Sequence, residues 1–163
     1  DLLHFNTIAP GQNHLSSNDF AERQEDFFKK DKNQPKPFVL ILGRDRDTRF
    51  LFKTAFQIWD YDVAEADEIN QVLLLTELKT PDLILMDGEI DLRESLQIMA
   101  ALKDNSSFGK CGFVLISGHA QDKIRQKALL AGANCFLVKP VDFDLLKQFV
   151  QTYFKERSLA VAY

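Results

Sequence analysis

The chain has 163 residues, of which 45% are hydrophobic and 27% charged, a composition that suits one globular domain with a substantial core. Its formal net charge of −4 argues against broad nucleic-acid binding through a basic surface. No apolar run approaches the roughly 20 residues of a membrane-spanning helix, and the first residues lack the basic start and apolar centre of a secretion signal. We therefore expect a cytoplasmic protein, or a fragment of one, with no membrane contact.

Residues 1–36 differ in composition from the rest of the chain. They are rich in Asn, Gln, Ser, Asp and Lys, and they end in QPKP, which is typical of an extended linker. Within this leader, the segment 18–30 could form a short helix with Phe20, Phe27 and Phe28 on one face. Two interpretations stay open: a helix that packs on its own domain, or the end of a coupling helix from an upstream domain.

Short apolar runs alternate with amphipathic segments between residues 37 and 156, and a tail of residues 157–163 follows. The apolar runs are typical of strands buried on both faces of a sheet, and the segments between them have apolar residues at helical spacing. The predicted strands are 38–42, 61–66 (an edge strand), 81–87, 112–117 and 134–140. The predicted helices are 47–59 (capped by Asp47), 69–79, 92–103, 121–133 and 143–156. This alternation predicts an α/β fold with a doubly wound parallel sheet.

Four of the predicted strands end in residues that carry chemistry. They end at Gly43 and Arg44, at Asp87, at Ser117 and at Lys139, and ligands of doubly wound sheets bind at the carboxyl ends of the strands. Asp87 could act as a nucleophile toward phosphorus. Lys139 could hold a phosphoryl oxygen as a point charge, and Ser117 could donate a hydrogen bond to another.

The order and spacing of these residues resemble those of the receiver domain of bacterial two-component response regulators. The matching segments are PDLILMD with Asp87, FVLISGH with Ser117, and AGANCFLVKP with Phe136 and Lys139. Thirty residues separate the aspartate from the serine, and twenty-two separate the serine from the lysine. The resemblance covers about residues 37–156 and implies a flavodoxin-like fold of five strands in the order 2-1-3-4-5.

The resemblance also implies roles for these residues. Asp87 occupies the phospho-acceptor position, which a histidine kinase or a phosphotransfer protein phosphorylates in a phosphorelay. Ser117 occupies the position of the hydroxyl that moves in response to the phosphoryl group, and Phe136 is the aromatic switch whose rotamer is coupled to this hydroxyl. Lys139 is the lysine of strand five, and the resemblance implies a cis peptide bond between it and Pro140. Partners, or a second copy in a homodimer, would bind the face formed by the fourth helix, the fifth strand and the fifth helix.

The end of the first strand departs from the family pattern. The family has an acidic pair there that holds Mg²⁺, and an ungapped alignment puts Gly43 and Arg44 on that pair. A guanidinium about 5 Å from a divalent ion is repelled by several kcal/mol even at an effective dielectric constant near 20. We therefore expect Mg²⁺ binding to be weak or absent. We expect Arg44 to pair with Asp87; the alternatives are that Arg44 turns to solvent, or that Asp45 moves in as a metal ligand.

The loop after Asp87 departs as well, with Asp91 where the family has proline and Glu89 adding a negative charge near Arg44 and Lys139. Two functions stay open. The first is a phospho-receiver with an impaired Mg²⁺ site. The second is a pseudo-receiver, which acts as a protein-interaction module without phosphorylation. In neither case do we expect an enzyme acting on a small substrate or direct binding to nucleic acid.

Overall fold

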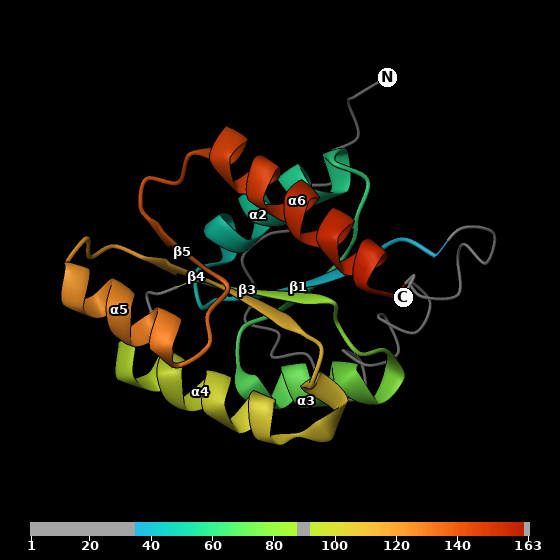
Figure 1. Ribbon diagram of the computed structural model, residues 1–163, viewed down its shortest axis with the longest axis horizontal. Helices are drawn as coiled ribbons and strands as arrows, with labels where there is room; N and C mark the ends of the chain where they lie inside the picture. The colour runs from blue at the N-terminus through green and yellow to red at the C-terminus, as the bar shows by residue number, and fades with distance from the viewer. Residues whose placement is uncertain (1–34, 88–91, 162–163) are drawn as a thin grey trace, which may run out of the picture.

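The computed structural model describes residues 35–87 and 92–161, and in this part of the chain five strands alternate with five helices (Figure 1). The strands are Phe38–Leu42 (β1), Asp62–Ala66 (β2), Leu83–Asp87 (β3), Gly112–Ser117 (β4) and Cys135–Val138 (β5). The helices are Arg46–Ile58 (α2), Ile69–Leu78 (α3), Leu92–Asp104 (α4), Asp122–Leu130 (α5) and Phe143–Val161 (α6), with a short 3₁₀ helix, Ser106–Phe108 (η1), after α4. None of these described helices is long and apolar enough to cross a membrane. The predicted leader helix, Glu89 and Asp91 lie outside the described residues.

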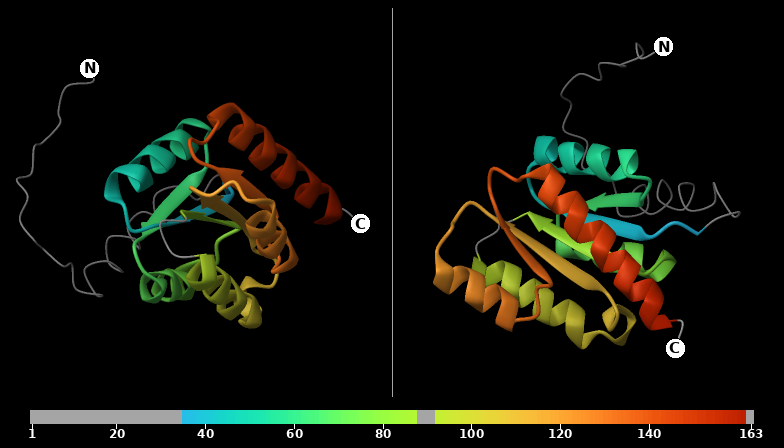
Figure 2. Two further views of the ribbon diagram at one scale, coloured as in Figure 1. Left: turned by 90° about the vertical axis from the view of Figure 1, so that its left-hand side faces the viewer. Right: turned by 45° about the horizontal axis from the view of Figure 1, so that its top comes forward.

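The strands form one parallel sheet in the order β2-β1-β3-β4-β5, which confirms the predicted fold and the edge position of β2. Helices α2 and α6 cover one face of the sheet, and α3, α4 and α5 cover the other (Figures 1 and 2). A hydrophobic core lies on each face of the sheet, and strand β1 contributes side chains to both. Phe38, Leu40 and Leu42 belong to the core beside α3–α5, whereas Val39 and Ile41 belong to the core beneath α2 and α6. Burial on both faces explains its unbroken apolar sequence.

Helix α2 begins one residue earlier than predicted, and its cap is a different aspartate. Asp45, not Asp47, is the N-cap: its backbone is extended and its Oδ2 accepts a hydrogen bond from Thr48 N at 2.8 Å. Asp47 lies inside the first turn, where its negative charge favours the helix N-terminus without capping it. The turn from β1 into α2 is therefore very short, which keeps the start of α2 close to the carboxyl end of β1.

Helix α6 is longer than predicted and includes most of the residues expected to form a tail. It continues to Val161, and in this extension Arg157 is anchored to Asp82, the residue before the central strand β3. Arg157 Nη1 donates to Asp82 O at 2.8 Å, and its Nη2 lies 3.3 Å from Asp82 Oδ1. This long-range anchor is not visible as a pattern in the local sequence.

Candidate functional site

The predicted site residues lie together at the carboxyl edge of the sheet. Asp87 is the last residue of β3 and Ser117 the last of β4, while Arg44 and Lys139 follow β1 and β5 closely. The registers bring these ends level, since Asp87 pairs with Ile116 on β4 and Ser117 pairs with Val138 on β5. This is the edge at which doubly wound sheets bind their ligands.

Asp87 is a buried carboxylate held by a lysine. Its side chain is only 1% exposed, and Lys139 Nζ lies 2.6 Å from Asp87 Oδ1. Neither Asp87 oxygen accepts a hydrogen bond of good geometry from the described residues. A buried charge without hydrogen bonds is costly unless an opposite charge compensates it, so the Lys139 ammonium is what keeps the ionised carboxylate stable in this position.

Arg44 does not pair with Asp87, and that prediction is wrong. Its Nη2 donates to both oxygens of Glu94, at 2.9 and 3.1 Å, in the first turn of α4. The two side chains are 60% and 42% exposed, and exposed pairs of this kind contribute about 0–1 kcal/mol. The pair ties the end of β1 to α4 and directs the guanidinium to a carboxylate that lies fifty residues further along the chain.

Gly43 lies directly against the Asp87 side chain. A Cβ added at this position would be 2.9 Å from Asp87 Cβ and 3.5 Å from Asp87 Oδ2. The Gly43 N–H also donates to Ala66 O at the end of β2 at 3.0 Å, so the backbone here is fixed on both sides. Any side chain at position 43, an aspartate included, requires Asp87 or the backbone to move.

Sequence analysis missed the role of Arg49. This arginine is only 8% exposed, and its Nη1 donates to Gly43 O at 2.6 Å and to Arg44 O at 3.0 Å. Its Nε also lies 3.7 Å from Glu65 Oε1 on β2. Arg49 therefore holds the carboxyl end of β1 in place from the first turns of α2. A signal existed, because Arg49 shares a helical face with the core residues Phe52 and Phe56.

Asp45 is engaged in capping α2, as described above, and is also hydrogen-bonded by the Thr48 hydroxyl. The hydrogen bonds from the Thr48 side chain and backbone lower the pKa of Asp45 below its usual value, and the charges of Lys139 and Arg49 act in the same direction. Both hydrogen bonds go to Oδ2, so one oxygen of this carboxylate is already occupied in the cap. The capping geometry thus gives no support to Asp45 as a metal ligand.

Ser117 and Phe136 are both buried near this edge, at 6% and 7% exposed. Ser117 Oγ accepts a hydrogen bond from His119 N at 3.1 Å, which gives His119 a backbone role in the loop. Phe136 packs in the core on the α3–α5 side, and the Arg125 guanidinium lies 6.0 Å from the centre of its ring. The Lys139–Pro140 peptide bond is cis, as the resemblance implied.

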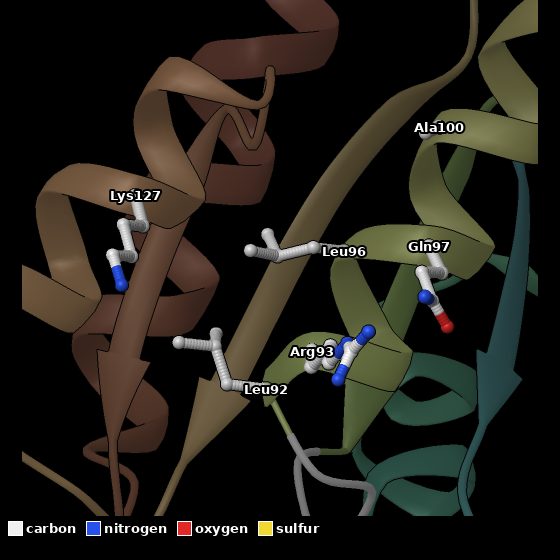
Figure 3. A pocket seen from close by; sticks show the side chains of 6 residues that line it. All are labelled: Leu92, Arg93, Leu96, Gln97, Ala100 and Lys127. Atoms are coloured by element: carbon white, nitrogen blue, oxygen red, sulfur yellow. The ribbon is translucent and has the colours of Figure 1, made fainter.

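A separate pocket of about 510 Å³ lies between α4 and α5. Figure 3 shows Leu92 and Leu96 reaching from α4 toward α5, where Lys127 forms part of the facing wall. The remaining lining residues are Arg93, Gln97 and Ala100. No predicted site residue lines this pocket, so it is distinct from the strand-edge site.

The strand order and the Asp87–Lys139 ion pair at the strand ends define a doubly wound α/β protein with the arrangement of a signalling receiver domain. The family model described as the response regulator receiver domain matches residues 39–151, and the chain belongs to this family. It is 28% identical over 131 residues to the sensor protein EvgS of Escherichia coli K12, covering 79% of this chain but only 11% of EvgS. The chain therefore spans about a tenth of the length of that relative.

Other relatives are closer to this chain in size. An uncharacterized 14.6 kDa protein of Leptolyngbya boryana is 26% identical over 115 residues, which are 71% of this chain and 88% of that protein. Among solved structures, a response regulator from Thermotoga maritima has a TM-score of 0.67 at 20% identity, covering 74% of this chain and 99% of that one. The chemotaxis protein CheY4 of Vibrio cholerae has a TM-score of 0.66 at 18% identity, covering 73% and 99%. At these identities the solved structures support the fold.

Receiver domains in general bind Mg²⁺ in an acidic pocket, but the residues at this site do not fit that ion. Magnesium prefers several oxygen ligands in octahedral geometry. Here Gly43 has no side chain, Arg44 carries a positive charge, and the Asp45 carboxylate caps α2, so among the described residues at this edge Asp87 is the remaining carboxylate. No group of three or more His, Cys, Asp or Glu side chains in residues 35–87 and 92–161 is arranged to hold a metal ion.

Proposed function

We propose that this chain is a phosphorelay receiver domain in which Asp87 is the phospho-acceptor and the Mg²⁺ site is impaired. The observation that carries this proposal is the Asp87–Lys139 ion pair, 2.6 Å long and at the ligand-binding edge of the sheet. A histidine kinase or a phosphotransfer protein is the proposed phosphoryl donor. We place the domain in the cytoplasm, where such donors act.

In the proposed reaction, an Asp87 oxygen attacks the phosphorus of a phosphohistidine, the P–N bond breaks, and the donor imidazole leaves with the bonding electron pair. Lys139 then contacts a phosphoryl oxygen and compensates part of the added negative charge. Ser117 Oγ already accepts a hydrogen bond from His119 N, which leaves its own hydroxyl proton available for a second phosphoryl oxygen. Phe136, packed beside β4, is the proposed switch that follows this hydroxyl.

The altered end of β1 predicts an unusual response to magnesium. The side chains of Gly43 and Arg44 supply no oxygen ligand, so the Lys139 ammonium beside Asp87 is the positive charge that would compensate the transferred phosphoryl group. We expect phosphorylation to be slow and to depend little on Mg²⁺. Single removal of a charge-stabilising group in other active sites costs about 10²–10³ in rate, which sets the scale of the expected deficit.

The test is to incubate the full chain with acetyl phosphate, with Mg²⁺ or with EDTA, and to follow phosphorylation by intact mass spectrometry. Asp87→Asn removes the proposed acceptor. Asp67→Asn is the matched control, because Asp67 is an exposed aspartate just after β2. We expect the wild type and Asp67→Asn to be modified and Asp87→Asn to stay unmodified. Modification of Asp87→Asn would refute the assignment of the acceptor.

The second candidate function is a pseudo-receiver that binds partners without phosphorylation. It is favoured by the burial of Asp87, whose charge Lys139 already compensates, and by the exposed Arg44–Glu94 pair between β1 and α4. Both contacts would hold the site in one state. The proposed partner surface is the face formed by α5, β5 and α6, where a homodimer would also form; sedimentation velocity tests the homodimer.

Arg44→Asp separates the two candidates. It restores one acidic ligand without adding a Cβ at Gly43, which would collide with Asp87. Amide NMR spectra of both proteins are recorded during titration with Mg²⁺ and beryllofluoride, a phosphoryl mimic. If the wild type responds to beryllofluoride around Asp87 and Ser117, with or without Mg²⁺, the phospho-receiver is supported. If only Arg44→Asp responds to beryllofluoride, the pseudo-receiver is supported. A response to Mg²⁺ by Arg44→Asp alone is expected for both candidates, because both have an impaired Mg²⁺ site.

A further inference from the structure

Helix α2 carries an exposed apolar stripe on its outer side. Phe50, Leu51 and Ile58 are 62%, 54% and 76% exposed, and we call these three residues the α2 stripe. Positions 51 and 58 are seven residues apart and positions 50 and 58 are eight apart, so the side chains line one side of the helix. Thr54, between them, donates its hydroxyl to Phe50 O at 2.8 Å, which turns its polar group onto the helix backbone. The stripe is therefore an apolar surface about two turns long.

The described part of the chain begins beside one end of this stripe. Lys36 Nζ lies 2.7 Å from Asp60 Oδ1, and Asp60 is two residues beyond Ile58. Asp62 N donates to Pro37 O at 3.1 Å, which fixes the backbone at the same end. The first described residues of the chain therefore lie at the C-terminal end of α2.

The leader has an apolar pattern that matches the α2 stripe. Phe20, Phe27 and Phe28 are separated by seven and eight residues, the same spacing as in the stripe. We propose that residues 18–30 form an amphipathic helix that packs these three aromatic side chains on the α2 stripe of the same chain. This inference does not depend on phosphorylation of Asp87.

The length of the linker allows this arrangement. Phe28 and Lys36 are eight residues apart, and at about 3.3 Å per residue an extended linker reaches up to ~26 Å. The α2 stripe itself is only about 12 Å long at a rise of about 1.5 Å per residue. The leader can therefore lie along α2 without displacing Lys36 from Asp60.

The point of attachment sets the direction of the leader. Because the linker starts at the C-terminal end of α2, Phe27 and Phe28 would contact Ile58, and Phe20 would lie further along toward Phe50.

The test is a nuclear Overhauser experiment on the full chain, with isotope-labelled isoleucine methyl groups and phenylalanine rings. We expect contacts between the Ile58 methyl groups and the rings of Phe27 and Phe28. A combined Phe20→Ser, Phe27→Ser, Phe28→Ser variant should lose these contacts and shift the Ile58 methyl resonance, while its amide spectrum stays that of the folded domain. Absence of the contacts in the wild type would overturn the proposal.

Hydrogen exchange gives an independent measurement with a matched control. Ile58→Ser should lower the protection of the leader amides by about tenfold or more, since burying an isoleucine is worth that much. Leu130→Ser removes an apolar side chain that is 89% exposed at the end of α5, and it should leave leader protection unchanged. Equal effects of the two variants would contradict the proposal. So would contacts that arise only between labelled and unlabelled copies in a mixed sample, which would assign the α2 stripe to a second copy.

Discussion

Replacing Gly43 with alanine tests how closely the end of β1 packs on Asp87. The added Cβ would lie 2.9 Å from Asp87 Cβ, whereas carbon atoms pack best at about 3.5–4.0 Å. Because Asp87 is buried and paired with Lys139, it has little room to move away. We expect an overpacking cost of about 1–3 kcal/mol, offset by about 0.4–1 kcal/mol because alanine restricts the unfolded chain.

Gly118→Ala is the control for this change. Gly118 follows β4 as Gly43 follows β1, but no atom of the described residues lies within 4 Å of an added Cβ there. Both substitutions alter the unfolded chain alike, so the difference between the two variants isolates the packing effect at Asp87. We expect Gly43→Ala to be less stable than Gly118→Ala by about 1–3 kcal/mol.

The free energy of unfolding is measured by urea titration followed by far-ultraviolet circular dichroism. Equal slopes for the wild type and both variants would show that the change lies in stability and not in the compactness of the unfolded state. If Gly43→Ala proves as stable as Gly118→Ala, then Asp87 is not held against β1 as the structure describes, and the reasoning fails.

Three further predictions follow from the contacts at the site. Lys139→Met leaves the buried Asp87 carboxylate without its compensating charge; since Lys139 is 28% exposed, we expect a loss of about 1–3 kcal/mol, partly recovered by adding Asp87→Asn. A double-mutant cycle in urea measures this, and additive effects would contradict the coupling. Arg49→Met should cost about 1–3 kcal/mol because it removes two hydrogen bonds to the end of β1, whereas Arg44→Met should change stability by about 0.5 kcal/mol or less. Equal losses in urea unfolding would mean that Arg49 does not hold β1. The lowered pKa of Asp45 means that its ionised form stabilises the fold above the ordinary pKa of 3.8 and that this contribution is lost as the pH falls through the lower folded value. The wild type should therefore have a higher Tm than Asp45→Asn at neutral pH, and the two Tm values should converge at acidic pH. A Tm difference that does not change with pH would show that the negative charge of Asp45 does not stabilise the fold.

Much of the site could be predicted because it sits at strand ends. Asp87, Ser117 and Lys139 each follow an apolar run, and parallel strands bring their carboxyl ends to one edge whatever the details of packing. The partner of Arg44 could not be predicted in this way. Glu94 is fifty residues away and lies on a helix whose rotation about its own axis depends on how Leu102 and Met99 pack beneath it.

The same distinction applies to Arg49 and Asp45. Arg49 lies on the buried face of α2, a position that its helical spacing with Phe52 indicates. Its hydrogen bonds to the backbone of Gly43 and Arg44 nevertheless depend on how closely α2 approaches the end of β1. The sequence analysis predicts Asp47 as the cap of α2, and this prediction is wrong: Asp45 is the N-cap, because the helix starts directly after the short turn that follows β1.

The sequence by itself determined the fold class, the order of elements, the parallel sheet and the edge at which chemistry gathers, because all of these follow from local hydrophobic periodicity and from residues at strand ends. Tertiary structure alone decided which charges meet: Asp87 with Lys139, Arg44 with Glu94, and Arg49 with the backbone of β1. The physical reason is range. Periodicity is set within a few residues, whereas an ion pair needs two side chains from distant elements within about 4 Å, and only the packed core fixes that separation.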